Sequence, residues 1–277
     1  PYPRPHTPRS PPRPTFVAAT LTLWKRDLVR FFRQRNRVIG ALGTPILFWI
    51  VLGSGLGRSF TLPDGHHAEG MAYLEYFFPG ALLMILLFTA IFSTFSVIED
   101  RREGFLQGVL VSPASRGAIV AGKVLGGASI AVIQGVIFLL AWPLVGTWPG
   151  VACMLGAAGI MVVLSLALVA LGLCIAWPMD STTGFHAVMN LFLMPMWLLS
   201  GAAFPVDGAS PWVRGVMWAN PLTYGHAALT SLLHGNPRGI GAPVPVWAAT
   251  AVTTAVALGL WGLAAALAQR PRKDGST

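Results

Sequence analysis

Charge is scarce in this chain. Asp, Glu, Lys and Arg make up only 10% of its 277 residues, whereas a soluble domain carries about 25%. Hydrophobic residues reach 54%, and the mean hydropathy is +0.64. These values exclude an ordinary soluble domain and predict a membrane protein.

Cysteine is also rare, and the first residues do not resemble a secretory signal. Cys153 and Cys174, the two cysteines of the chain, lie inside one apolar run. They offer no disulfide framework and no thiolate metal cluster, so we expect small packing residues. Residues 1–14 are rich in Pro and Arg where a secretory signal would be apolar. We expect this segment to be a disordered or polyproline leader, and we assign it no function.

Long apolar runs are abundant. A transmembrane helix needs about 20 mainly apolar residues. Six stretches qualify, namely residues 38–57, 77–98, 119–145, 151–177, 185–204 and 246–268. The sequence therefore predicts an all-α polytopic membrane protein with six transmembrane helices, and an even number of spans puts both termini on one side.

The basic residues predict which side that is. Sixteen of the 19 Lys and Arg residues lie in the terminal segments and in the loop between spans two and three. Only Arg58, Arg214 and Arg238 lie in the opposite loops. Cytoplasmic loops collect Lys and Arg, so we expect both termini and that loop to be cytoplasmic. The net charge of +9 then reflects orientation, and we expect no nucleic-acid partner.

Acidic residues are missing from the interior of the apolar runs. All ten Asp and Glu residues lie outside these runs or at their edges. Ion-coupled carriers usually keep ionisable groups at membrane depth, and here only His186, near one end of the fifth span, is a candidate. With Asn190 one turn further, His186 is more typical of hydrogen bonding between helices. We therefore expect any uphill transport to be powered by another protein, with an ion-coupled carrier as the alternative.

Two segments outside the spans have a helical period. In residues 15–37 the apolar positions, Trp24 and Phe31 among them, share one face, and Arg26, Arg30 and Arg33 lie on another. This pattern predicts a helix in the membrane interface, with its aromatic side chains in the acyl boundary and its arginines on anionic headgroups.

The second segment begins with five charged residues, residues 99–103. Four of them, Glu99, Arg101, Arg102 and Glu103, are candidates for contact with a partner protein. An apolar stripe follows, made of Phe105, Leu106, Val109 and Leu110, and then a turn at Ser112 and Pro113. A short cytoplasmic helix with such a stripe can dock into the groove of a partner protein or fold back on the lipid surface, and periodicity leaves both open.

A phosphate-loop frame comes directly after this segment. Gly117 to Lys123 fits G-x-x-x-x-G-K, but Val124 replaces the Ser or Thr that would hold magnesium. We therefore expect no nucleotide site. Gly122 and Gly126 predict close helix packing instead, and Lys123 is expected to snorkel to the headgroups.

The passage "REGFLQGVLVSPASRGAIVAGKVLGG" resembles the signature of the type-2 ABC exporter permeases (ABC-2 permeases), commonly E-R-E-x-G-T-L-E-x-L-x-x-S-P-x-S-R-x-x-I-x-x-G-K. Phe105 and Gly108 depart from it. A second passage, "SGAAFPVDGASPWVRGVMWANPLTYGHAAL", is similar to the family's S-G-x-x-F-P and N-P-L-T-Y segments around the last two spans. The resemblance covers about residues 24–268.

The resemblance implies a role for each segment. Residues 99–112 would be the coupling helix, seated in a cleft of a separate cytoplasmic ATPase that binds ATP and Mg²⁺; this chain would hold no cofactor. Residues 15–37 would be the interfacial connecting helix, 38–268 the permease domain and 269–277 a cytoplasmic tail. Two permeases, identical or different, would pair with two ATPases in a prokaryotic plasma membrane. The cargo would be a drug, a lipid or a lipid-linked glycan, and apolar spans favour a hydrophobic or amphipathic one.

The segment between spans five and six is too long for a hairpin and is interrupted by prolines. The resemblance implies short re-entrant helices that cap the pathway, and an ordinary interfacial loop is the alternative. The candidate cap residues are Phe204, Pro205, Trp212, Asn220, Pro221 and Tyr224. The histidines near this segment match no metal-ligand spacing, so we expect no metal. The sequence has no H-E-x-x-H and no G-x-S-x-G motif, which leaves an intramembrane lipid-modifying enzyme as the least favoured alternative.

Overall fold

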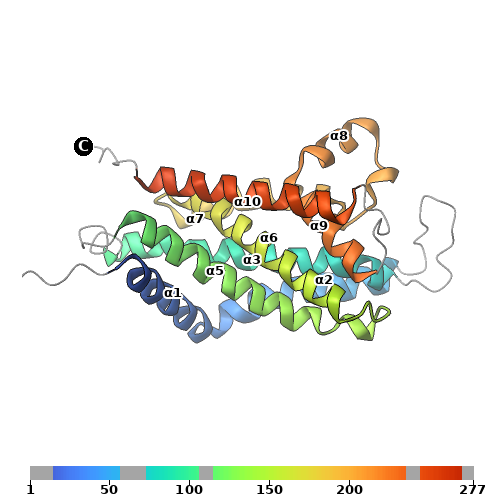
Figure 1. The fold of residues 1–277 in the computed structure, drawn as a ribbon, viewed down its shortest axis with the longest axis horizontal. Helices are drawn as coiled ribbons and strands as arrows, with labels where there is room; N and C mark the ends of the chain where they lie inside the picture. Colours follow the sequence, from blue (N-terminus) through green and yellow to red (C-terminus); the bar gives the residue numbers. More distant parts are fainter. Residues whose placement is uncertain (1–14, 57–72, 106–114, 235–243, 270–277) are drawn as a thin grey trace, which may run out of the picture.

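A computed structural model describes residues 15–56, 73–105, 115–234 and 244–269 of the chain. Within these ranges the protein is all-helical and contains no strand. The helices run roughly along the long axis of the molecule (Figure 1). In chain order they are α1 (Phe16–Arg33), α2 (Arg35–Leu56), α3 (Tyr73–Arg102), α5 (Arg116–Leu139), η1 (Trp142–Leu144), α6 (Val151–Ala176), α7 (Thr182–Trp197), η2 (Leu198–Ala202), η3 (Val206–Gly208), α8 (Pro211–Ala219), α9 (Pro221–Leu233) and α10 (Val246–Gln269).

Six of the described helices are long and apolar enough to cross a membrane: α2, α3, α5 with η1, α6, α7 with η2, and α10. They coincide with the six predicted spans, which confirms the predicted fold class. The boundaries differ in one informative place. We expected the second span to end at Ile98, but α3 continues through the charged residues to Arg102. The helix therefore carries its charges on a rigid extension of the span.

The centre of the bundle is α3. It packs against α2, α5 and α6, and its side chains from Tyr76 to Leu87 are all buried. In its most apolar stretch 78% of the residues are buried, compared with 17% in α2 and 22% in α10. A helix that is apolar all round belongs in a core. The outer helices α2 and α10 leave large apolar surfaces for lipid or for another protein.

The first helix packs closely against α5, which it crosses at one end of the bundle (Figure 1). It begins at Thr15, whose hydroxyl accepts a hydrogen bond of 3.3 Å from the N–H of Ala18. The contact depends on two glycines of α5. A Cβ atom on Gly122 would lie 2.8 Å from Leu23 Cβ, and one on Gly126 would lie 3.2 Å from Asp27 Cβ. The predicted close packing at these two glycines is confirmed. The expected connecting helix over 15–37 is shorter, because α1 ends at Arg33 and α2 begins at Arg35.

The chain bends sharply after α7. Pro195 lies in the last turn of α7, and the following π turn, η2, contains Gly201 at a φ of +88°, a backbone conformation that favours glycine. Tyr76 of α3 donates a hydrogen bond of 3.4 Å to the carbonyl of Gly201. The chain then forms η3, α8 and α9. Helix α8 projects from the end of the molecule that lies far from α1 (Figure 1), and α9 returns to pack against α6 and α10.

Candidate functional site

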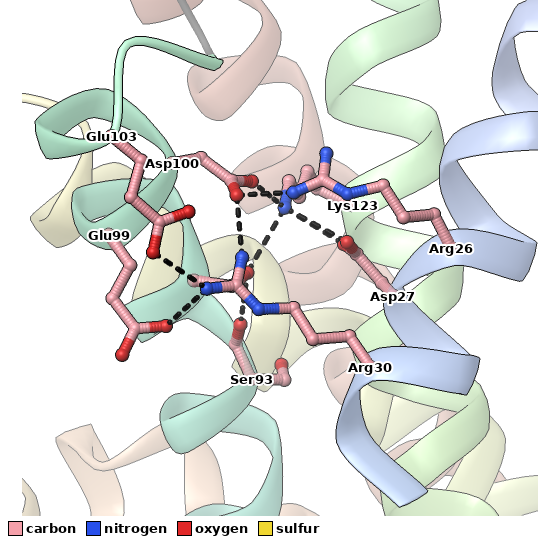
Figure 2. Close-up of polar contacts among 9 residues, drawn as sticks. Arg26, Asp27, Arg30, Ser93, Glu99, Asp100, Glu103 and Lys123 are labelled. Carbon is pink, nitrogen blue, oxygen red and sulfur yellow. Dashed lines mark hydrogen bonds and ion pairs between the residues drawn. The ribbon is translucent and has the colours of Figure 1, made fainter. Parts of the chain in front are cut away.

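Seven charged residues meet where α1, α3 and α5 come together at one end of the bundle. We call them the charged cluster: Arg26, Asp27 and Arg30 from α1, Glu99 and Asp100 from the end of α3, Glu103 directly after it, and Lys123 from α5. Their ion pairs form one connected network (Figure 2). The three helices lie far apart in the sequence, so the network forms only when they pack together.

Lys123 is the buried cation of the cluster. Its Nζ lies 2.7 Å from Asp100 Oδ2 and 2.9 Å from Asp27 Oδ2, and the Lys123 and Asp100 side chains are 4% and 0% exposed. It also donates to Ser96 Oγ at 3.1 Å. The expectation that Lys123 snorkels to the headgroups is therefore wrong. Two carboxylates in the core attract the ammonium inward, because an unpaired buried carboxylate is strongly unfavourable.

The two arginines of the cluster also point inward. Arg26 and Arg30 both bind Asp100 Oδ1, the latter at 2.7 Å. Arg30 reaches Glu99 at 3.2 Å and Glu103 at 3.4 Å as well. We expected arginines of this segment on lipid headgroups, but these two neutralise the end of α3. Charge-assisted hydrogen bonds from a guanidinium fix α1 against α3 with directional geometry.

Other predicted residues of α1 have separate environments. Trp24 donates its indole N–H to Ser129 Oγ at 3.0 Å, so one edge of the ring is attached to α5. Phe31 is buried at 3% exposure. Arg33 is exposed on the last turn of α1.

The cluster extends to the first residue of the predicted apolar stripe. The Arg26 guanidinium carbon lies 3.6 Å from the centroid of the Phe105 ring, a cation–π geometry. Phe105 itself is 39% exposed, so part of its ring remains accessible. The other predicted coupling residues, Leu106, Val109, Leu110, Ser112 and Pro113, lie outside the described residues.

Arg101 and Arg102 leave the cluster in a different direction. Arg101 donates to the carbonyls of Trp177 and Met179, both at 2.7 Å, and lies 3.2 Å from Asp180 Oδ1. Arg102 donates to Thr182 Oγ1 at 3.4 Å. These partners form the short turn between α6 and α7. The end of α3 therefore contacts α1 on one side and the α6–α7 turn on the other.

The G-x-x-x-x-G-K frame, at which we expected no nucleotide site, is helical. Gly117 to Lys123 are the first turns of α5, and the Lys123 amine is occupied by Asp27 and Asp100. A phosphate loop needs a free lysine and a run of exposed backbone N–H groups. The frame is a helix-packing surface.

At the other end of the bundle, the predicted cap residues lie just before η3, on α8, between α8 and α9, and on α9. Asn220 joins α8, α9 and α7: its Oδ1 accepts the N–H of Leu222 at 3.0 Å, and its Nδ2 donates to the carbonyl of Met196 at 2.5 Å. Pro221 is the first residue of α9, a position that needs no N–H donor. The Tyr224 hydroxyl donates to the Trp218 carbonyl at 2.9 Å.

The remaining cap residues differ in exposure. Phe204 and Pro205 are half-buried next to η3, and Trp212 on α8 is 74% exposed. An exposed Trp at the end of a membrane bundle suits the lipid interface.

Two histidines lie near the cap: His226 is buried on α9, and His234, directly after α9, is half-buried. Burial, with a smaller contribution from the neighbouring His234, lowers the pKa of His226 from 6.5 to about 4. Burial also lowers the pKa of His234. Both residues lie outside the six candidate spans, and both are neutral at pH 7. In the described part of the chain, no three His, Cys, Asp or Glu side chains are grouped so that they could hold a metal ion.

A small groove between α3 and α7 is lined by polar groups of the candidate span α7. His186 and Asn190 line it with Phe88, Phe92, Met189 and Met194 among its other residues. Both polar side chains are exposed on the surface of α7, and the His186 ring lies 5.1 Å from that of Phe95. Polar groups in a span usually face another protein or a water-filled cavity.

Comparison with known proteins identifies the family. The family model for the ABC-2 type transporter matches residues 18–234. The chain belongs to the ABC-2 type transporter family. Similar proteins include the probable multidrug ABC transporter permease YbhR of Escherichia coli, 29% identical over 55% of this chain and 42% of YbhR. The match thus spans less than half the length of that relative.

Two further relatives match over most of their length. Nodulation protein J of Rhizobium leguminosarum bv. viciae is 24% identical over 78% of this chain and 83% of its own length. The daunorubicin resistance ABC transporter permease protein DrrB1 of Streptomyces coeruleorubidus is 24% identical over 82% of this chain and 78% of its own length. The predicted resemblance to ABC-2 permeases is confirmed.

In this ABC-2 family member, sequence reasoning missed the buried half of the charged cluster. The sequence places Asp27 and Asp100 outside the apolar runs or at their edges, but the two residues are only 8% and 0% exposed. A signal for Asp27 was present, because it lies four residues from both Leu23 and Phe31 and so shares their packed face. No local signal could have paired Asp100 with Lys123, because that contact depends on the angle between α3 and α5.

Proposed function

We propose that this chain is the permease subunit of an ATP-driven exporter and that a separate cytoplasmic ATPase docks on the segment around Phe105. Membership in the ABC-2 family supports the class, and the relatives YbhR and DrrB1 are named as ABC transporter permeases. The charged cluster carries the proposal. It ties α1 and α5 to the helix end that leads into the expected coupling helix.

The geometry suits the transmission of force. A partner that pushes on the segment after Glu103 acts directly on α3, the central helix of the bundle. The buried pairs of Lys123 resist separation, because breaking one leaves an uncompensated charge. Helices α1, α3 and α5 would therefore move as one body. ATP and Mg²⁺ would bind only to the partner ATPase, and no cofactor would bind to this chain.

The groove between α3 and α7 supports a path between two copies of the permease or between this chain and a similar one. Exposed His186 and Asn190 would be unfavourable against lipid tails. A second permease placed there, or a cargo molecule with polar and aromatic groups, would satisfy them. The aromatic and Met side chains around them favour a hydrophobic or amphipathic cargo. A drug, a lipid or a lipid-linked glycan has this chemistry.

The charge distribution supports the expected location. The charged cluster and both chain termini would face the cytoplasm of a prokaryotic cell, with the six helices in its plasma membrane. Helices α8 and α9 would then form the external cap. Helix α1 carries exposed apolar residues such as Leu21 and Phe32 near exposed Lys25 and Arg33, which suits a helix in the membrane interface.

The proposal is tested by purifying the chain from its native membrane in a mild detergent. We expect a soluble subunit with a complete Walker A motif to co-purify, and we expect it to be lost from a variant in which the apolar stripe is changed to Ser. That variant changes Phe105, Leu106, Val109 and Leu110. The matched control places Ser at four exposed apolar positions near the opposite end of the bundle, namely Leu140, Leu144, Trp148 and Val151.

The alternatives predict other results. A folded chain that co-purifies with no ATPase would contradict the exporter proposal. Equal loss of the ATPase from the control variant would contradict the docking site alone. An ion-coupled carrier would stop working when the ion gradient is collapsed with ATP retained, whereas the proposed exporter would continue.

A further inference from the structure

We infer that Arg101 is a positioning residue: it connects the coupling segment to α7 and so transmits the ATPase-driven movement to the helix that lines the α3–α7 groove. The inference rests on the proposed function. It begins with the way α7 is held, because this helix packs mainly against α3 and its own continuation η2. By contrast, α6 packs against α3, α5, α9 and α10. Among the described helices, α7 therefore has few neighbours besides α3 and η2, and its position depends on its contacts with α3.

The contacts of Arg101 are suited to pulling on the turn that precedes α7. Its two terminal nitrogens bind two different carbonyls, those of Trp177 and Met179, each at 2.7 Å. Trp177 is the C-terminal capping residue of α6, and Met179 lies in the turn that follows. Carbonyls at the C-terminal end of a helix lack a donor from their own helix, so they are good acceptors for a cation. The planar guanidinium binds both at once, which fixes direction as well as distance.

The side chain is also sheltered and reinforced. Arg101 is 17% exposed, and Asp180 lies 3.2 Å from it on the solvent side. Arg102 adds a hydrogen bond to Thr182, the first residue of α7. Four contacts from two consecutive residues at the end of α3 therefore hold the whole α6–α7 turn.

The path continues inside the membrane. Phe95 of α3 lies against Phe185 and His186 of α7, with ring centroids 6.3 and 5.1 Å apart. These aromatic contacts fix the half of α7 that follows the turn. His186 and Asn190 lie on the same half and line the groove. A displacement of α3 thus reaches the polar groups of the groove through Arg101 first and the aromatic contacts second.

A second arginine offers a matched control. Arg116, at the start of α5, donates to the carbonyls of Ala268 and Gln269 at 3.1 and 3.3 Å. It binds the C-terminal end of α10 as Arg101 binds that of α6. Helix α10 does not line the groove. Loss of Arg116 therefore removes a comparable contact without cutting the route to α7.

The test measures movement of α7 in the complex with the co-purified ATPase. Spin labels are placed on Ala187 of α7 and Ala255 of α10, both exposed, after the two native cysteines are replaced by Ser. A second pair, Ala18 and Ala255, reports on α1. Distances are measured by double electron–electron resonance without nucleotide and with ATP and vanadate.

We expect nucleotide to shift both distances in the wild type. In Arg101→Gln the shift of the Ala187 pair should be lost, while that of the Ala18 pair and ATP hydrolysis persist. Arg101→Lys, which keeps one donor and the charge, should retain a reduced shift. Arg116→Gln should behave as the wild type in both pairs.

Three results would overturn the inference. A full shift of the Ala187 pair in Arg101→Gln, with only a lower melting temperature, would mean that Arg101 merely stabilises the turn. If Arg101→Gln does not assemble, a full shift in Arg101→Lys has the same meaning. No shift of either pair in a wild-type complex that hydrolyses ATP would contradict the proposed function, and the inference would fall with it.

Discussion

The ammonium of Lys123 lies 2.7 Å from the carboxylate of Asp100, and both side chains are buried, at 4% and 0% exposure. The pair joins α5 to the end of α3, and Asp27 attaches α1 to the same ammonium at 2.9 Å. Buried ion pairs of this kind add little net stability, but removing one member is strongly destabilising. They therefore act as a geometric constraint: the three helices keep one relative position or lose it together.

The first prediction concerns this constraint. Lys123→Met should lower the free energy of unfolding by about 3–5 kcal/mol, because it leaves the carboxylate of Asp27 buried without its cation. Adding Asp27→Leu should restore part of the loss, since the second change removes the uncompensated charge. Thermal unfolding in detergent measures the single and double variants, and the coupling between them is the decisive quantity.

The control for this cycle is Lys25→Gln on the exposed side of α1. It should change stability by no more than about 0.5 kcal/mol. If the changes in the free energy of unfolding caused by Lys123→Met and Asp27→Leu simply add in the double variant, the two residues do not form the buried ion pair.

The second prediction concerns the close approach of α1 and α5. Gly122→Val should separate the helices, because even a Cβ atom at this position would lie 2.8 Å from Leu23 Cβ and 3.1 Å from the backbone carbonyl oxygen of Thr20. Overpacking of this kind costs about 1–3 kcal/mol. Disulfide trapping between cysteines introduced into α1 and α5 should become slower.

Gly117→Ala is the matched control in the same helix, since its Cβ atom would meet only the Phe16 ring at 3.6 Å, an ordinary contact. Trapping in Gly117→Ala should proceed as in the wild type. Equal trapping in Gly122→Val and the wild type would mean that α1 does not depend on this glycine.

The sequence predicted the helices well and their contacts poorly. Apolar length alone located the six spans, because a membrane imposes that length on every helix. The small residues Gly122 and Gly126 also predicted a packed face, since only a residue without a side chain allows so close an approach. The partner of that face was not predictable. Nothing local to Gly122 specifies that α1 packs there instead of another span.

The contacts within the charged cluster were not predictable from the sequence either. Hydropathy places Asp100 and Lys123 at the ends of apolar runs, where solvent is the usual partner. Their burial depends on α3 extending beyond its apolar run to Arg102 and on α1 covering the gap. Long-range packing therefore reversed the expectation for Lys123. The family signature indicated which segment is special without indicating what its charges bind.

The third prediction concerns pH. The pKa of His226 is lowered from 6.5 to about 4, so protonation favours the unfolded chain. The stability that the neutral imidazole contributes is fully present above about pH 6.5 and is lost as the pH falls toward 4. His234, whose pKa is also lowered by burial, adds to the same trend. Melting temperature in detergent should fall between pH 7 and pH 4.

Replacing both histidines with Gln should make this pH profile flatter, because neither amide titrates. The comparison is made within each variant, so any general loss of stability from the substitutions cancels. An unchanged profile in the double variant would assign the acid sensitivity to other groups.

The fourth prediction separates two roles of Asn220. Its Oδ1 caps α9, and its Nδ2 binds the Met196 carbonyl on the other side of the bend. Asn220→Ala removes both contacts and should cost at least about 1 kcal/mol from the cap alone. Asn220→Asp keeps an acceptor for the cap but places a carboxylate against the Met196 carbonyl. Hydrogen–deuterium exchange should therefore increase over α9 in the alanine variant only, and over the bend at η2 in both variants. Unchanged exchange at η2 in Asn220→Asp would mean that the bend is held by the Tyr76 hydroxyl and the conformation of Gly201 rather than by this side chain.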